Sequence, residues 1–151
     1  MGYIADLGSK VEKEPIILAG SCVLLFNSEG QLLLQQRTDS SEWRIIEGAM
    51  KPGESLEETA ARQLYEDTGL SAAAYHYVTI LSDLSYNDAY HHDPQDADVY
   101  HVTAVFEARE VSGELKSQDC VEIKQRYFCL KSPLPKLEPS TEYILIKAGY
   151  L

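Results

Sequence analysis

Apolar and polar positions alternate along the first third of the chain in a way that predicts strands. Residues 16–26, with the sequence IILAGSCVLLF, are rich in β-branched and large apolar side chains, which favours a strand. Turn-forming residues follow at 27–30, and residues 31–37, QLLLQQR, predict a second strand. The two segments together indicate a β-hairpin.

A helical spacing replaces the strand pattern after Ser55. Ser55 offers a hydroxyl N-cap, and Glu58 lies three residues later, which is the sequence pattern of a capping box. Thr68 followed by Gly69 provides a stop at the other end. At about 100° per residue, four apolar side chains share one side of this amphipathic helix: Leu56, Ala60, Ala61 and Leu64.

The rest of the chain predicts further strands and one more helix. Strands are expected at residues 43–46, 75–81, 98–106 and 121–130, a polar loop at residues 85–97, and a closing helix at residues 140–150. Residues 1–14 are expected to be an N-terminal extension that could form a short helix. The pattern predicts a mixed α/β fold in a single domain over residues 1–151.

Composition is compatible with one globular domain. The chain has 151 residues, of which 44% are hydrophobic and 25% charged, close to the average for soluble proteins. The longest apolar runs fall far short of the roughly 20 residues that a membrane span needs. No basic segment followed by an apolar one begins the chain, so we expect no secretory signal, no membrane association and a cytoplasmic location.

Cysteine spacing and charge exclude other classes. Three cysteines without a Cys-x-x-Cys spacing argue against a disulfide framework and against a zinc site. Thirteen basic residues stand against 24 acidic ones, which gives a net charge of −11. This charge repels a nucleic-acid backbone, so we do not expect duplex nucleic acid as a partner. We do expect a divalent cation.

Acidic side chains gather on one arc of the predicted helix. Gln63, Glu66 and Asp67 are separated by steps of three and four, which places them on the same side, and Glu54 lies just before the helix. Converging carboxylates repel one another unless a cation lies among them, and Mg²⁺ or Mn²⁺ prefers such oxygen ligands. The alternative is a solvated face on which Arg62 and Glu66 form an ordinary i, i+4 ion pair.

The spacing of residues 48–70 favours the metal site, because this segment resembles the Nudix box. The box has the pattern G, x5, E, x7, R, E, apolar, x, E, E, x, G, apolar, and the chain matches seven of the nine specified positions. Gln63 and Asp67 depart from it, since both positions have Glu in the pattern. The resemblance to small bacterial Nudix hydrolases covers most of the chain. It implies an α/β/α sandwich with a mixed β-sheet.

The resemblance also implies roles for residues of the box. A divalent metal, Mg²⁺ or Mn²⁺, is expected to be held by Glu66 and Asp67 together with Gly48 and Gln63. Arg62 matches the arginine that orients the catalytic carboxylate. Gln63 stands where the family has a glutamate that binds metal or deprotonates water, and an amide can coordinate through its carbonyl but cannot accept a proton at neutral pH.

The proton acceptor is therefore expected outside the box. Glu122 is the favoured candidate, and Glu47 and the acidic residues of segment 88–98 are alternatives. Glu47 is itself a departure from the family, because many relatives have glycine there.

Substrate contacts are expected from aromatic and basic side chains near the box. Trp43, Tyr86 and Tyr90 could stack on a nucleobase, although packing inside the protein explains each ring equally well. Arg37 and Arg44 are expected to neutralise phosphate charge, for which the planar guanidinium suits bidentate contact.

These residues predict a metal-dependent hydrolase of a nucleoside diphosphate linked to another moiety, with activated water cleaving the pyrophosphate bond. The alternative is a catalytically impaired domain that binds a nucleotide as a sensor or scaffold. The expected partner is a small nucleoside diphosphate derivative. The sequence leaves the oligomeric state open, a homodimer included.

Overall fold

The computed structural model describes residues 15–90, 99–116 and 123–151. Its main sheet contains four strands in the order β3 (Ile46–Ala49), β1 (Ile16–Leu25), β5 (Val99–Ser112) and β4 (Ser71–Leu81). Strand β1 pairs parallel with β5 and antiparallel with β3, and β5 pairs antiparallel with β4, so the sheet is mixed. Two further strands, β2 (Leu32–Arg37) and β6 (Ile123–Phe128), form a separate antiparallel pair.

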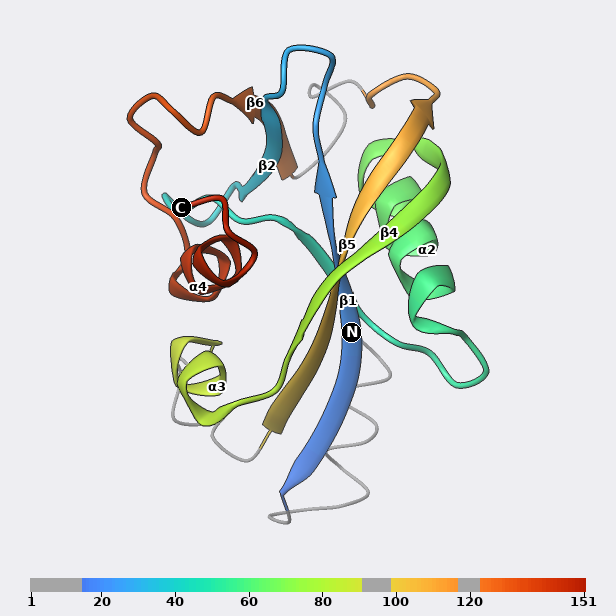
Figure 1. The fold of residues 1–151 in the computed structure, drawn as a ribbon, viewed down its shortest axis with the longest axis vertical. Helices are drawn as coiled ribbons and strands as arrows, with labels where there is room; N and C mark the ends of the chain where they lie inside the picture. The colour runs from blue at the N-terminus through green and yellow to red at the C-terminus, as the bar shows by residue number, and fades with distance from the viewer. Residues whose placement is uncertain (1–14, 91–98, 117–122) are drawn as a thin grey trace.

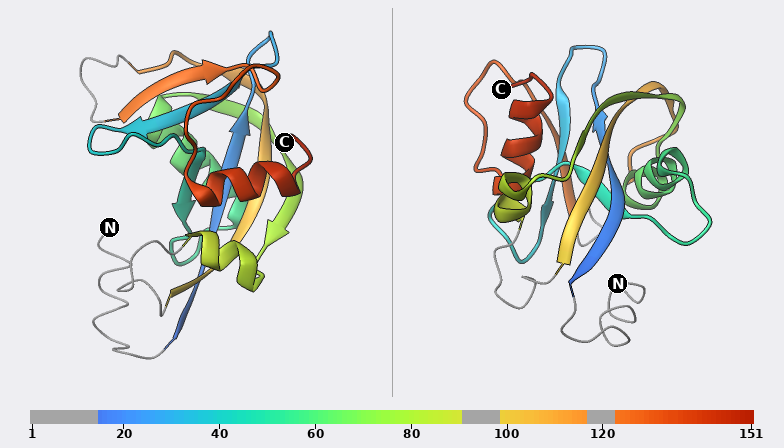
Figure 2. Two further views of the ribbon diagram at one scale, coloured as in Figure 1. Left: turned by 90° about the vertical axis from the view of Figure 1, so that its left-hand side faces the viewer. Right: turned by 60° about the horizontal axis from the view of Figure 1, so that its bottom comes forward.

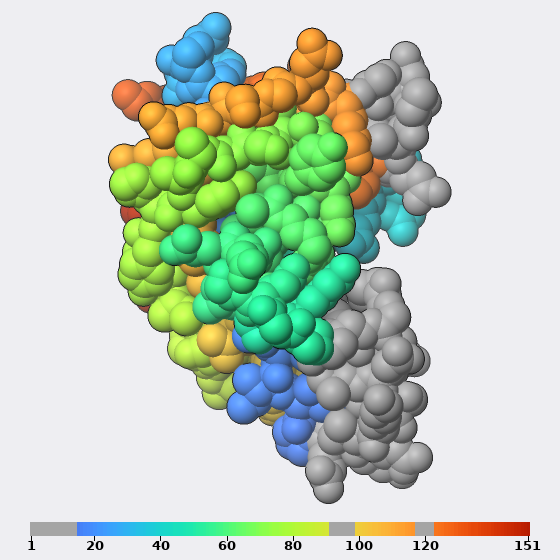
Figure 3. Space-filling model, turned by 90° about the vertical axis from the view of Figure 1, so that its right-hand side faces the viewer, coloured from blue at the N-terminus to red at the C-terminus, as the bar shows by residue number. Residues whose placement is uncertain are grey.

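Helices cover both faces of the main sheet. Helix α2 (Leu56–Thr68) lies on one face, whereas α3 (Leu84–Tyr90), α4 (Pro139–Lys147) and the β2–β6 pair lie on the other (Figures 1 and 2). Figure 3 shows the α2 face, on which the helix leaves the start of β1 uncovered below it. These layers are the α/β/α sandwich with a mixed sheet that the sequence predicts, and the fold class is confirmed.

The core has two parts, one on each face of the sheet. Because the side chains of a strand alternate between faces, Val23 and Leu25 of β1 pack toward α2, and Cys22 and Leu24 pack toward α4. Burial on both faces explains why β1 is a nearly continuous apolar run. Among the described residues, no helix is both long and apolar enough to cross a membrane.

Helix α2 is bounded by the residues that the sequence indicates. The Glu58 backbone N–H donates to Ser55 Oγ at 3.0 Å, and the Ser55 N–H donates to the Glu58 carboxylate at 2.8 Å, so the capping box is confirmed. Gly69 ends the helix with φ of 79°, a left-handed conformation that glycine adopts without a steric cost.

The predicted β-hairpin is reduced to a single bridge between Phe26 and Leu32. Beyond this bridge β2 pairs with β6, whereas β1 pairs with β3 on one edge and with β5 on the other. The short strand expected at residues 43–46 begins later, at Ile46, and Arg44 instead makes an isolated bridge to Gln35 of β2. Both differences arise because tertiary pairing overrides the local pattern.

The polar loop expected at residues 85–97 is wrong over its first part, where the chain forms α3. Tyr86 and Asn87 of this helix are buried, so long-range packing stabilises a helix in a segment of polar composition. Residues 91–98 lie outside the described part, as do residues 1–14 with the expected N-terminal helix.

Asn87 connects α3 to the sheet. Its Oδ1 accepts a hydrogen bond from the His101 N–H at 2.6 Å, and its Nδ2 lies within hydrogen-bond distance of three backbone carbonyls, those of Ser82, Asp83 and His101. With 2% of its surface exposed, Asn87 satisfies backbone groups that water reaches poorly.

We expect Asn87→Ala to destabilise the fold by about 2 kcal/mol, because buried backbone groups lose their partners. Urea unfolding followed by circular dichroism measures this change. Asp88→Ala, an exposed neighbour on the same helix, is the matched control. Equal unfolding free energies for the two variants would show that the Asn87 contacts contribute little.

Candidate functional site

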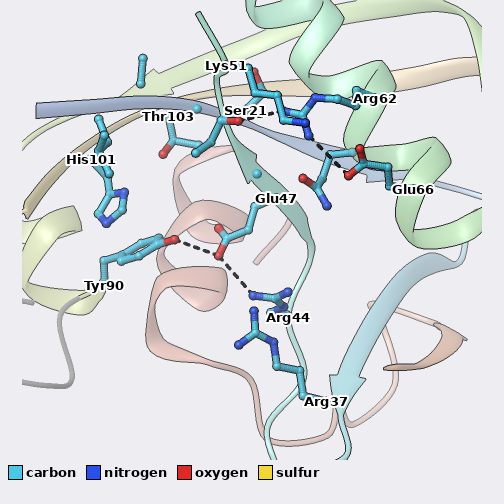
Figure 4. Close-up of a pocket in the computed structure, with 16 residues that line it drawn as sticks. Ser21, Arg37, Arg44, Glu47, Lys51, Arg62, Glu66, Tyr90, His101 and Thr103 are labelled. Atoms are coloured by element: carbon cyan, nitrogen blue, oxygen red, sulfur yellow. Dashed lines mark hydrogen bonds and ion pairs between the residues drawn. The ribbon is translucent and has the colours of Figure 1, made fainter. Parts of the chain in front are cut away.

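A cavity of about 600 Å³ opens beside β3, between the box helix α2 and the start of β5 (Figure 4). Its charged lining residues are four cations and two carboxylates: Arg37, Arg44, Lys51, Arg62, Glu47 and Glu66. In a chain with a net charge of −11, this local excess of positive charge favours an anionic ligand.

Arg62 connects three segments at one end of the cavity. Its Nε lies 2.6 Å from one oxygen of Glu54 and its Nη2 lies 3.0 Å from the other, which is a bidentate ion pair. Nη2 also donates to the carbonyl oxygen of Ala49 at 2.8 Å, and Nη1 lies 3.4 Å from the Glu66 carboxylate. The hydrogen bonds from Arg62 lower the pKa of Glu54 to about 2.

Gln63 and Asp67, the two departures from the box, are bonded to each other. Gln63 Nε2 donates to Asp67 Oδ1 at 2.8 Å, and Gln35 Nε2 donates to Asp67 Oδ2 at 3.1 Å. A third amide, Gln125, donates to the Asp67 backbone carbonyl at 2.6 Å. Both carboxylate oxygens of Asp67 are therefore engaged by amides, and Asp67 does not line the cavity.

Gly48 lies directly against the side chain of Gln63. A Cβ atom at residue 48 would collide with the side-chain carbonyl oxygen of Gln63, so a larger residue there would displace the Gln63 side chain. With its amide nitrogen bonded to Asp67, Gln63 directs its carbonyl oxygen toward Gly48 at the cavity wall.

The donors near the box are oxygen atoms. Within the described ranges, no group of three or more His, Cys, Asp and Glu side chains could hold a metal ion. The Glu66 carboxylate and the Gln63 carbonyl both line the cavity, and hard divalent cations bind such oxygen atoms with water completing the coordination. The donor chemistry thus fits Mg²⁺ or Mn²⁺. Because Gln63 is neutral, the protein supplies one negative charge fewer to the cation than a box with Glu at position 63.

The opposite wall of the cavity contains an acid and two aromatic rings. Tyr90 donates its hydroxyl to Glu47 Oε1 at 3.2 Å, and Arg44 Nη1 lies 3.8 Å from the same oxygen (Figure 4). The Tyr90 ring lies against His101, with ring centroids 3.7 Å apart. Burial raises the pKa of Glu47.

The structure brings some predicted site residues to the cavity and places others elsewhere. Arg37 and Arg44 line it. Trp43 instead packs edge-on against Phe128, with centroids 5.0 Å apart, and Tyr86 is fully buried with its hydroxyl 2.8 Å from Thr103 Oγ1. Neither ring lines the cavity, and packing inside the protein, the alternative that the sequence left open, accounts for both.

Tyr90, the third ring that could stack on a base, lines the cavity, and so does His101, which the sequence did not single out as a substrate contact. Tyr90, four positions after Tyr86, supplies the aromatic wall, and His101 of β5 lies beside it. The helical period of α3 explains the difference, since both tyrosines lie on one side of the helix and Tyr90 is nearer to the cavity. Glu122, the favoured proton acceptor, lies outside the described residues.

A family model supports the resemblance seen in the sequence. The NUDIX domain model matches residues 17–147, which is most of the chain. The chain belongs to the Nudix family.

Curated relatives match shorter segments. A Bacillus subtilis protein provisionally named 8-oxo-dGTP diphosphatase is 35% identical over 72 residues, 48% of each chain. An RNA pyrophosphohydrolase of Erythrobacter litoralis is 43% identical over 53 residues, 33% of this chain and 32% of the relative. The chain thus spans about a third to a half of the length of these relatives.

Solved structures share the fold. The MutT NUDIX hydrolase of Burkholderia pseudomallei has a TM-score of 0.69 at 18% identity, over 87% of this chain and 97% of that one. A MutT protein of Bacillus halodurans has a TM-score of 0.60 at 24% identity, over 76% and 69% of the two chains.

We expect Gln63→Glu to lower the melting temperature by about 2–4 °C in the presence of a chelator, as a loss of roughly 1 kcal/mol does in a chain of this size. The change replaces an amide donor with a carboxylate that repels Asp67. Added Mg²⁺ should recover part of the loss, because a cation that binds the native state stabilises it. Differential scanning fluorimetry measures both effects.

Gln36→Glu is the control for this change, since it adds the same charge on β2 on the face opposite to Gln35. Equal melting temperatures of the two variants would show that the contact between Gln63 and Asp67 contributes little to stability.

Acid should remove the contribution of Glu54 to stability. Its folded pKa of about 2 lies below its ordinary value of 4.5, so the contribution is complete above pH 4.5 and is lost as the pH falls toward 2. We expect the difference in unfolding free energy between the native chain and Glu54→Gln to narrow over this range in urea titrations with chelator. Glu29→Gln, in an exposed turn, is the matched control. A difference independent of pH would contradict the role of the Arg62 pair.

Proposed function

We propose that this chain is a metal-dependent hydrolase that cleaves the pyrophosphate bond of a nucleoside diphosphate linked to another moiety. The observation that carries the proposal is the cation-rich cavity beside the box helix of a strongly acidic protein. A pyrophosphate carries the charge that such a cavity attracts, and the guanidinium groups of Arg37 and Arg44 suit bidentate contact with phosphate oxygens.

Nudix proteins generally use divalent metal ions. Glu66 and the Gln63 carbonyl, with Gly48 at the same wall, would hold Mg²⁺ or Mn²⁺ here, whereas Asp67, the fourth predicted ligand, does not line the cavity and accepts hydrogen bonds from two amides. When bound, the cation would polarise the phosphoryl oxygens and lower the pKa of a coordinated water. Arg62 orients Glu66 through their ion pair while Glu54 fixes the guanidinium from the other side. Glu122 stays the predicted proton acceptor.

A second candidate is a domain that binds a nucleotide without hydrolysing it. Two contacts favour it: Gln63 cannot accept a proton from water, and amides engage both carboxylate oxygens of Asp67. The cavity serves either function, because the cations that attract a pyrophosphate are the same.

The named relatives guide the choice of substrates to test. Nucleoside triphosphates, triphosphate-ended RNA, ADP-ribose, nucleotide sugars and dinucleoside polyphosphates together cover the proposed class. The cytoplasmic location, the small-molecule partner and the homodimer stay predictions.

Glu66→Gln should lower metal-dependent kcat/KM for the best substrate of this panel by at least about a hundredfold, the usual effect of removing one group that stabilises the transition state. Phosphate and nucleotide release measure the activity. Glu57→Gln, an exposed position in the first turn of the same helix, is the matched control.

Unchanged turnover in Glu66→Gln would contradict the proposed metal site. A native chain that binds nucleotides saturably but releases no product with Mg²⁺ or Mn²⁺ would favour the binding function over the hydrolase.

A further inference from the structure

Glu47 has one oxygen anchored and one oxygen open. The Tyr90 hydroxyl and the Arg44 guanidinium both approach Oε1. Oε2 accepts no hydrogen bond from any residue that the structure describes. It is also not one of the buried side-chain atoms that lack a partner, so it remains accessible to solvent. With 13% of its side chain exposed, Glu47 presents a fixed hydrogen-bond acceptor to the cavity.

An aromatic wall lies beside this acceptor. Tyr90, which orients Glu47, also lies against His101, and both rings line the cavity. Figure 4 shows these rings on one side of Glu47, with Arg62 and Glu66 on the other. Aromatic side chains provide stacking surfaces for any nucleobase.

The two ends of the cavity therefore suit different parts of a nucleotide. Lys51, Arg62 and Glu66 supply charge for phosphates and a cation. The carboxylate of Glu47 repels phosphate and accepts N–H donors, so the planar base fits the end where Tyr90 and His101 lie. At about 600 Å³, the cavity has the size of a small-molecule site.

The carboxylate distinguishes among bases by their donor pattern. Guanine alone presents two adjacent donors on its pairing edge, N1–H and the N2 amine. Adenine and cytosine place a ring acceptor beside their single amine, which a carboxylate repels, and uracil places its N3–H between two carbonyls. Glu47 Oε1 keeps capacity for a second donor, because Arg44 lies at ion-pair distance and Tyr90 is the only residue in the described part of the chain that donates to it within 3.5 Å.

We propose that Glu47, oriented by Tyr90 and Arg44, is the base-reading residue of this cavity and selects guanine nucleotides. The proposal rests on the nucleotide ligand of the proposed function and not on its catalytic step.

Equilibrium binding of GDP and IDP tests this selection, because IDP differs from GDP only in lacking the N2 amine. Calorimetric titrations of the full chain with chelator present avoid turnover. We expect the native chain to bind GDP at least about tenfold more tightly than IDP, as a hydrogen bond to a charged acceptor gives. Glu47→Gln, of nearly equal size, should bring the two affinities within about threefold of each other.

Tyr90→Phe keeps the aromatic wall and removes the hydroxyl that orients Glu47, so an intermediate ratio is expected. Glu29→Gln, far from the cavity in an exposed turn, should keep the native ratio. Circular dichroism and melting temperatures confirm that each variant is folded before its ratio is compared.

Native affinities for GDP and IDP that are equal, or a native ratio retained in folded Glu47→Gln, would overturn the proposal. So would a chain that binds neither nucleotide. If Glu47→Gln loses turnover with the binding ratio unchanged, Glu47 acts in the chemistry and does not read the base. Discrimination by a chain that hydrolyses no nucleotide would support the subsite while refuting the hydrolase.

Discussion

The bidentate pair between Arg62 and Glu54 is the interaction on which the arrangement of the site depends. One guanidinium contacts the loop before α2 through Glu54, strand β3 through the Ala49 carbonyl, and the carboxylate of Glu66 one turn further along the helix. Because the guanidinium stays protonated and presents several donors in one plane, Arg62 can hold these three segments together. The cavity wall on the box side follows from this contact.

The two departures from the Nudix pattern compensate each other. Gln63 replaces an anion with an amide, and that amide donates to Asp67, whose shorter side chain stays at the helix surface near Gln35. Repulsion between two carboxylates becomes a hydrogen bond. The negative charge available to bind a cation falls at the same time. The hydrogen bond between Gln63 and Asp67 therefore stabilises the helix but leaves this position without a carboxylate for metal binding or proton transfer.

The sequence predicted best those features that depend on neighbouring residues. The limits of α2 follow from Ser55, Glu58 and Gly69, which act within one or two helical turns. Long-range contacts were not predictable in the same way. Strand β2 pairs with β6, which lies about 90 positions further along the chain, and Tyr86 packs into the core against residues far from it in the sequence. Tyr90 meets Glu47 across 43 positions, a contact that no local pattern encodes.

The parallel pairing of β1 with β5 also determines when the sheet can form. Ile16 lies beside Val99 and Leu25 beside Ala108, so the partners are 83 positions apart. At a synthesis rate of about 5–20 residues per second, β1 waits between roughly 4 and 17 s on the ribosome for its central neighbour. During that time its apolar run has neither face covered by the finished sandwich. The nascent chain is therefore most exposed to aggregation in its first strand, before the cavity beside β3 exists.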